Sequence, residues 1–372
     1  MRSLAWCCVA LLAACGRLGF DAGDDVDAPP VKPGSFTRVV AYADQTCALA
    51  GGRAYCWGRN ADAQLGDGSR MDRHVPAEVA LPSGKVDVIA PGETHGCAIM
   101  EGDLYCFGSG FAVQPAHVPL VLPVTAVAAG RAFTCAVTDF VNCWGSNDRG
   151  QLGDGTSNPH NVPQPIASSR MFQALSAGDD HACAVSFTSN DAKCWGHNDN
   201  GAIGIGSANA DEPTPSVVPG ITTLPQIAAF HTCTVDGGKV SCWGRNTDGE
   251  LGDGGSTDAS LPQPVPNLVD VTALAVGGSA ADMDATCAVR GGEVLCWGAG
   301  KFGRLGNGTT SGSNLPLSVA LPGRATGIAL GYNHTCALLD DGEIWCWGRG
   351  DAGQLGDGRA TDSFAPVRVV AP

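Results

Sequence analysis

The sequence predicts an all-β fold, a seven-bladed β-propeller, for residues 36–372. The first observation is a unit that recurs seven times and is seen most clearly in residues 336–358. Its period of roughly 50 residues is that of one propeller blade rather than of a helical or leucine-rich repeat. The second observation is composition, because 52 glycines in 372 residues, with Pro, Asn and Asp between the copies, are typical of turn-rich β structure. No linker separates the copies, which favours one large domain.

The third observation is a pair of cysteines in every copy, eight to eleven positions apart. In the first copy the pair is symmetric about Gly51-Gly52, which suits a two-residue hairpin turn. That register makes the cysteines a non-hydrogen-bonded pair, whose Cβ atoms lie closest across the ladder, so a disulfide can close there. No C-x-x-C motif occurs, so the pairing indicates disulfides in an oxidising compartment rather than zinc sites. The seven predicted disulfides are Cys47–Cys56, Cys97–Cys106, Cys135–Cys143, Cys183–Cys194, Cys233–Cys242, Cys287–Cys296 and Cys336–Cys346.

Residues 1–14 predict a signal peptide. They carry one positive charge, at Arg2, and an apolar run over residues 4–14 that is too short to cross a bilayer. The small residues Ala13 and Ala14 directly before Cys15 resemble the lipobox of bacterial lipoproteins, and this resemblance implies cleavage before Cys15 and its acylation. Gly16 resembles the outer-membrane sorting pattern. An ordinary secretory signal with an incidental cysteine is the alternative.

Residues 15–35 are predicted to form a disordered tether. They are acidic and proline-containing and show no periodic apolar pattern. The whole chain has a formal net charge of −15, and a surface this acidic repels phosphate backbones. The sequence therefore disfavours nucleic acid as a partner.

Each segment of a copy has a predicted place in its blade. The Trp-Gly after the second cysteine is a core anchor, with Phe107 in place of Trp in the second copy. The loop that follows has asparagine at its third position in four copies, and we interpret this residue as one that tolerates the left-handed backbone of a shaped turn. These residues are Asn60, Asn147, Asn198 and Asn246. A proline-marked segment such as residues 163–166 then predicts the outer strand, and an apolar run such as residues 86–90 predicts the inner strand of the next blade.

The two ends of the repeat predict how the ring closes. The first blade begins at its inner strand, whereas residues 366–370 form a surplus proline-marked strand. We therefore predict that the C-terminal strand pairs into blade 1 and removes the open edges of the ring.

The combined pattern, C-A-L/V followed by C-W-G-x-N-x-x-G-Q-L-G-D-G, closely resembles the regulator of chromosome condensation repeat over residues 36–372. The resemblance implies a seven-bladed propeller that presents loops to a protein partner. The eukaryotic founder of the family is a nucleotide exchange factor for a nuclear GTPase, and some secreted bacterial members resemble tight inhibitors of other proteins. The paired cysteines and the lipobox depart from the nuclear founder, which argues against a GTPase partner.

The remaining motifs do not indicate a catalytic or metal site. Two G-x-G-x-x-G matches, at residues 298–303 and 348–353, lead into Leu-Gly rather than a helix, so we interpret them as turns. Acidic pairs in turns are expected to be solvated caps rather than glycosidase carboxylates. Four histidines stand two positions before the first cysteine, where the other copies have Gln, Phe or Ala, so we expect one structural hydrogen bond for each rather than a metal ring. They are His95, His181, His231 and His334. We expect no cofactor, no metal and no enzyme activity.

Two copies break the repeat. The first cysteine stands five residues after the turn glycine, or its equivalent, in six copies but ten residues after it in blade 6, so residues 279–284 are predicted to form an extra loop. Blade 2 is shorter, because it lacks the Gln-Leu-Gly-Asp-Gly segment. In an alternating blade the turn before the first cysteine and the loop after Trp-Gly share one face, which therefore carries a projection and a notch. The alternative is neutral loop drift. The predicted partner-binding residues are Asp44, Glu93, Arg131, Asp179, Asp180, Asp282, Met283, Asp284, Tyr332 and Asn333.

Together these features predict a monomeric cell-envelope lipoprotein, held to the outer membrane by the lipid on Cys15. Its propeller is expected to bind an unidentified protein partner through the face just described. The alternatives are a structural envelope scaffold without a dedicated partner, and a guanine-nucleotide exchange-like or propeller enzyme activity.

Overall fold

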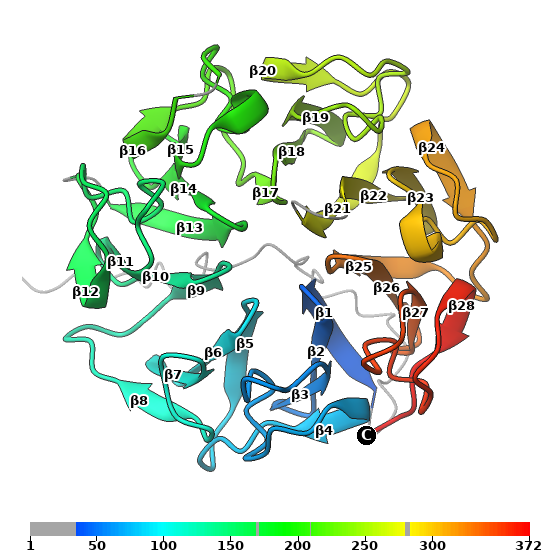
Figure 1. The fold of residues 1–372 in the computed structure, drawn as a ribbon, viewed down its shortest axis with the longest axis horizontal. Coiled ribbons are helices and arrows are strands. Elements are labelled where there is room, and N and C mark those ends of the chain that lie inside the picture. The colour runs from blue at the N-terminus through cyan, green and yellow to red at the C-terminus, as the bar shows by residue number, and fades with distance from the viewer. Residues whose placement is uncertain (1–34, 169–170, 209, 280–282) are drawn as a thin grey trace, which may run out of the picture.

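The computed structural model describes residues 35–168, 171–208, 210–279 and 283–372. Its strands form seven four-stranded sheets arranged in a ring (Figure 1). Each sheet is an antiparallel meander whose first strand lies at the centre of the ring and whose fourth lies at the rim. The predicted seven-bladed β-propeller is confirmed. Among the described residues, no helix is long and apolar enough to cross a membrane.

Each blade is built from one continuous stretch of chain. Blade 1 comprises β1 (Phe36–Tyr42), β2 (Gln45–Ala50), β3 (Arg53–Gly58) and β4 (Arg73–Glu78). Blade 2 comprises β5 (Val86–Pro91), β6 (His95–Met100), β7 (Asp103–Gly108) and β8 (Ala116–Val118). Blade 3 comprises β9 (Ala126–Ala129), β10 (Phe133–Val137), β11 (Val141–Gly145) and β12 (His160–Pro165). Blade 4 comprises β13 (Phe172–Ala177), β14 (His181–Ser186), β15 (Ala192–Gly196) and β16 (Glu212–Val217).

The other three blades follow the same order. Blade 5 comprises β17 (Gln226–Ile227), β18 (His231–Asp236), β19 (Lys239–Gly244) and β20 (Ala259–Pro264). Blade 6 comprises β21 (Val271–Ser279), β22 (Met283–Arg290), β23 (Glu293–Gly298) and β24 (Ser313–Val319). Blade 7 comprises β25 (Ala325–Leu330), β26 (His334–Leu339), β27 (Ile344–Gly348) and β28 (Ser363–Arg368). Two short 3-10 helices, η1 (Asp199–Gly201) and η2 (Lys301–Gly303), lie in the loops after β15 and β23.

All fourteen repeat cysteines are paired as the hairpin register predicts. In blade 1, Gly51 and Gly52 form the turn with positive φ, Ala50 faces Arg53, and Cys47 faces Cys56. The Cα atoms of each bonded pair lie 4.1 Å apart, as expected for a non-hydrogen-bonded position. The disulfides therefore join the second and third strands within every blade.

The prediction that the C-terminal strand closes the ring in blade 1 is wrong. Strand β28 pairs with β27 of its own blade, and blade 1 has its own outer strand, β4, which contains Pro76. The outer strand follows the Trp-Gly of its own blade, so neither end of the repeat has a strand to spare. Blades 7 and 1 meet instead through side chains, with Phe36 and Trp57 of blade 1 packed against Leu338 and Ile344 of blade 7.

Neighbouring blades are joined by a polar contact beside each tryptophan. The indole Nε1 of Trp57 donates to the carbonyl oxygen of Gln354 in blade 7 at 3.0 Å, and the hydroxyl of Thr46 donates to the same carbonyl at 3.1 Å. The same indole contact recurs at Trp195, Trp243, Trp297 and Trp347, each to a carbonyl in the loop of the preceding blade. Blade 7 therefore joins blade 1 by the contact that joins most other pairs of blades.

The four repeat histidines complete this joint. Each places its Nε2 within hydrogen-bonding distance of a threonine hydroxyl on the next blade, at 2.7 to 3.1 Å. The pairs are His95 with Thr134, His181 with Thr232, His231 with Thr286, and His334 with Thr46. Burial lowers the pKa of His95 to about 4 and that of His181 and His334 to about 3, so these three rings are neutral at pH 7. The expectation of one structural hydrogen bond holds for His95, His181 and His334, whereas His231 also contacts Asp284 through Nδ1.

The asparagines at the third loop position have a different role from the predicted one. Asn60 does not have positive φ, and its side chain is fully buried. Its Nδ2 donates to Asp67 Oδ1 and to the carbonyl of Met71, each at 3.1 Å, while its Oδ1 accepts from the backbone N–H of Leu65. Asn246 makes the equivalent contacts. These amides hold the long loop closed, and the interpretation as a left-handed turn residue is wrong.

The joint between blades 2 and 3 provides an internal control for the indole hydrogen bond. Trp144 of blade 3 has no carbonyl partner for its Nε1 among the described residues, because blade 2 lacks the loop that would supply one. We expect Trp297→Phe to lower the free energy of unfolding by about 1 kcal/mol more than Trp144→Phe, since only Trp297 loses a buried hydrogen bond. Denaturant unfolding of both variants measures the difference, and equal losses would contradict this role.

Candidate functional site

One face of the ring carries the turns between the first and second strands and the loops between the third and fourth strands. We call it the loop face. The residue after each Trp-Gly donates its backbone N–H to a carbonyl in the turn of the same blade, as in Arg59 to Asp44 and Arg349 to Asn333, both at 2.9 Å. The same contact occurs in the other five blades. The prediction that the two kinds of loop share one face is confirmed.

The loop face is irregular at blades 2 and 6. The loop between the third and fourth strands spans residues 146–159 in blade 3 but only 109–115 in blade 2, which leaves the predicted notch. In blade 6 the extra residues lengthen β21 and β22, so that Gly277 faces Ala285 and Ser279 faces Met283. The predicted loop over residues 279–284 is thus largely an extended hairpin. Its tip, including Asp282, lies outside the described residues.

Charged side chains surround the notch. Arg131 is exposed and its guanidinium lies 2.5 Å from the carboxylate of Asp180, which also accepts a hydrogen bond from Gln151 at 3.3 Å. Glu93 of blade 2 is half-buried nearby, and burial raises the pKa of its carboxyl while Arg131 lowers it. This edge of the loop face therefore presents one exposed cation beside carboxylates.

A second polar cluster spans the channel at the centre of the ring. The hydroxyls of Tyr42 in blade 1 and Tyr332 in blade 7 donate to Asp179 Oδ1 of blade 4, at 2.6 and 3.2 Å. The pKa of the Asp179 carboxyl is raised to about 7, mainly by burial and also by the neighbouring carboxylates of Asp284 and Asp180, against the lowering effect of the Tyr42 hydrogen bond. Three blades are therefore connected across the loop-face end of the channel.

This cluster predicts a pH-dependent stability. Because the folded-state pKa of Asp179 lies above its usual value of 3.8, its contribution to stability is complete below pH 3.8 and is lost as pH rises to about 7. Asp179→Asn keeps the Oδ1 acceptor without the charge. We expect its free energy of unfolding to exceed that of the wild type by a margin that grows from pH 4 to 7, by at most about 1.4 kcal/mol per pH unit. Melting temperatures measured across this pH range should show the same trend. The exposed Asp148→Asn variant is the control, and parallel pH profiles for the three proteins would contradict the cluster's role.

Asp284 lies inside the molecule. Its side chain is fully buried, and its Oδ2 accepts from His231 Nδ1 at 3.0 Å and from the backbone N–H of Phe230 at 2.9 Å. His231 Nε2 contacts Thr286, whose hydroxyl donates to the carbonyl of Glu250. With the threonine proton engaged, His231 Nε2 donates to Thr286 while its Nδ1 faces the Asp284 carboxyl group, so these contacts tie blade 5 to blade 6.

The structure thus divides the predicted partner-binding residues. Arg131 is exposed, and Asp44, Glu93 and Tyr332 are half-buried on the loop face. Asp179, Asp180, Asn333 and Asp284 are buried, so these four hold the face together rather than present it to solvent. The sequence reasoning placed Asp179, Asp180 and Asn333 correctly on turns, but Asp284 lies in β22. It did not detect the partners of the three aspartates, which lie on other blades. Met283 lies in β22, and Cys15 lies outside the described residues, as do the signal peptide and the tether as far as residue 34.

Sequence reasoning also missed residues at this face. Tyr42 occupies the position that is glycine or alanine in every other blade, and this substitution at a repeat position was the available signal. Within the described ranges, no group of three or more His, Cys, Asp or Glu side chains is placed to hold a metal ion.

Fold and site together define a disulfide-linked seven-bladed propeller with an irregular, charged loop face. A model of the regulator of chromosome condensation (RCC1) repeat matches residues 51–99, 141–185, 237–280, 291–338 and 341–372, more than half of the chain. A second model of the same repeat matches residues 172–202 and 325–354. The chain therefore belongs to the regulator of chromosome condensation repeat family.

Individual relatives extend this comparison. The chain is 29% identical over 347 residues to the ultraviolet-B receptor UVR8 of Arabidopsis thaliana, which covers 86% of this chain and 77% of the receptor. It is also 29% identical over 351 residues to the E3 ubiquitin-protein ligase HERC2 of Homo sapiens, which covers 87% of this chain but 6% of the ligase.

Among solved structures, human WBSCR16 has a TM-score of 0.76 at 21% identity and covers 86% of this chain and 94% of its own. Prp20p of Saccharomyces cerevisiae has a TM-score of 0.70 at 19% identity and covers 91% and 88%. Both are similar in fold.

Proposed function

We propose that this protein is a non-enzymatic module that binds another protein through its loop face. The observation that carries the proposal is that the blades depart most from one another there. The extended hairpin of blade 6, with β21 ending at Ser279, and the short loop of blade 2 both lie on this face. A surface that differs from blade to blade can recognise one partner, whereas a symmetric ring of equal loops offers seven equal sites.

Relatives support protein binding as the mode of action. Prp20p has been characterised for its binding to Gsp1p and histones, and a yeast RCC1 structure contains bound Kap60. For this chain, the formal charge of −15 disfavours nucleic acid, and the exposed Arg131 beside Asp180 and Glu93 offers mixed charge to a protein surface. The structural scaffold remains the second candidate if no partner exists.

We further propose that the protein is a lipoprotein of the cell envelope, monomeric and anchored through Cys15. The signal-like residues 1–14 and the small residues before Cys15 support this location, as do seven disulfides, which require an oxidising compartment. Metabolic labelling with palmitate tests it. The wild type should incorporate label and Cys15→Ala should not, and equal labelling of both would rule out the lipid anchor.

The binding face is tested by site-specific photocrosslinking in the native envelope. A photoreactive residue at position 131 on the loop face should capture a partner. The control variant carries the photoreactive residue at position 187 instead. Phe187 is 57% exposed and lies in the turn between β14 and β15, on the opposite face. Deleting residues 279–283 restores the five-residue interval between Gly277 and Cys287, keeps Asp284, and should abolish the crosslink from position 131.

The outcomes separate the candidates. Capture from position 187 instead of 131 would show that the loop face is not the binding surface. Capture from position 131 that survives the deletion in a folded variant would show that the blade 6 hairpin takes no part in binding. No specific crosslink from any loop-face position would favour the structural scaffold.

A further inference from the structure

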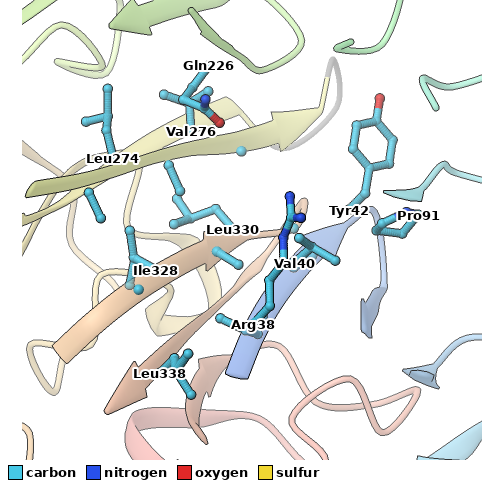
Figure 2. A pocket seen from close by; sticks show the side chains of 18 of the residues that line it. Arg38, Val40, Tyr42, Pro91, Gln226, Leu274, Val276, Ile328, Leu330 and Leu338 are labelled. Carbon is cyan, nitrogen blue, oxygen red and sulfur yellow. The ribbon is translucent and has the colours of Figure 1, made fainter. Parts of the chain in front are cut away.

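The first strands of the blades enclose a central channel with a volume of about 1100 Å³. Its wall is mostly apolar, with Arg38, Arg324 and three aspartates as its charged residues, and Figure 2 shows Val40, Val276 and Leu330 among the side chains that line it. Small-molecule pockets in proteins usually measure about 300–1000 Å³ and combine an apolar wall with a few polar groups. The channel is therefore large enough to hold a ligand.

One side chain in this wall carries a charge that the repeat does not require. Arg38 lies on β1, and its guanidinium projects into the channel between Val40 and Leu330 (Figure 2). The register of the disulfide-bonded strands identifies its equivalents in the other blades. Each is paired two residues beyond the first cysteine, except in blade 5, where the position follows by extending the register of β17. These equivalents are Val88, Ala126, Ala174, Leu224, Ala273 and Gly327, and none is charged.

The guanidinium of Arg38 has no anionic partner in the described part of the chain. No ion pair or side-chain hydrogen bond involves it, although Asp179 lines the loop-face end of the channel and Asp340 and Asp341 line the other end. The Asp179 carboxyl is instead engaged by Tyr42 and Tyr332. Burial lowers the pKa of Arg38, which reflects the cost of removing this cation from water.

A partly desolvated cation without a partner is unfavourable unless something compensates its charge. A planar guanidinium forms two parallel hydrogen bonds with a carboxylate or a phosphate, so the missing partner is an anion of that shape. The apolar side chains around it favour a hydrocarbon attached to the anion. We propose that the channel binds an anionic amphiphile, with its carboxylate or phosphate head group on Arg38 and its alkyl chain against the apolar wall. This site does not depend on the loop-face proposal.

Isothermal titration calorimetry of the full chain tests the proposal. The probes are dodecanoate and dodecyl phosphate, each below its critical micelle concentration, and they distinguish a carboxylate from a phosphate ligand. Acetate tests the head group alone, and dodecyltrimethylammonium tests the alkyl chain with the opposite charge. We expect at least one of the two anionic amphiphiles to bind and neither control compound to bind.

The variants assign the binding to Arg38. Arg38→Leu and Arg38→Gln are expected to weaken binding at least about ten-fold, because a charge-assisted hydrogen bond is lost. Both variants should melt no lower than the wild type, since they remove an unpaired charge. Arg53→Leu changes an exposed arginine paired with Glu78 on the blade surface and should bind as the wild type does.

Three results would overturn the proposal. They are no binding of either anionic amphiphile to the wild type, undiminished binding to both folded Arg38 variants, and equal binding of dodecyltrimethylammonium. Tight binding of acetate alone would show that the apolar wall plays no part, and would equally refute an amphiphile site.

Discussion

Reduction of the seven disulfides is expected to lower the free energy of unfolding more than any single substitution. Each bridge closes a loop of 8 to 11 residues, which in the chain-entropy model stabilises the fold by at most roughly 2–3 kcal/mol. Seven such losses exceed the usual stability of a domain, about 5–15 kcal/mol, so the reduced chain should not refold. Tryptophan fluorescence in denaturant, with and without reductant, measures the loss, because five of the repeat tryptophans are fully buried.

The native protein should resist the same reductant. Its paired cysteines are at most 1% exposed, so alkylation followed by mass spectrometry should find no free thiol among them until denaturant is added. The Cys47→Ser/Cys56→Ser double variant should lose only the part of the free energy of unfolding that one disulfide contributes. If the fully reduced protein unfolded at the same denaturant concentration as the oxidised one, the bridges would not stabilise this fold.

Asp284→Asn is expected to be the most damaging conservative substitution on the loop face. It removes the carboxylate that accepts hydrogen bonds from His231 Nδ1 and from the backbone N–H of Phe230, and a buried hydrogen bond to a charged group contributes about 1.5–3 kcal/mol. The measurement is the denaturant concentration at the midpoint of unfolding at pH 7, which should be lower than that of the wild type. This result contrasts with Asp179→Asn, which is expected to stabilise, although both residues are buried aspartates on the same face.

A second substitution identifies the cause. Blade 1 has Gln45 at the position of His231, and its Nε2 donates to the carbonyl of Gly92 in the next blade. His231→Gln should therefore recover part of the stability lost in Asp284→Asn, because no buried ring nitrogen then faces the missing carboxylate. If the losses of stability in the two single variants simply added up in the double variant, the two residues would act independently and this explanation would be wrong.

The sequence allowed the blades to be predicted because their determinants are local. The Gly51-Gly52 turn fixes the register that pairs Cys47 with Cys56, and all of these residues lie within one hairpin. Trp57 was recognised as a core anchor from its own position, but not the carbonyl of Gln354 to which it donates, 297 positions away. Features within a blade were therefore predictable, whereas contacts between blades were not.

The candidate site illustrates the same limit. Asp284 and Asp179 were predicted to stand in loops, where an exposed position is the ordinary expectation, yet Asp284 lies in β22 and the partners of both, His231 and Tyr42, lie on other blades. Arg38 was missed for a different reason. Its signal is a charge at a register position that is uncharged in the other six blades, and that position could be aligned only once strand pairing was known.

The independence of the blades has a consequence for how the chain can be cut. No strand is shared between blades, and blade 7 meets blade 1 by the same Trp57 and Thr46 contacts that join other neighbours. The chain ends could therefore lie between any two neighbouring blades. A circular permutant that joins residue 372 to residue 36 through a flexible linker and opens between Pro219 and Gly220 should fold with all seven bridges intact, because the new ends fall at exposed residues in the connection between two complete blades.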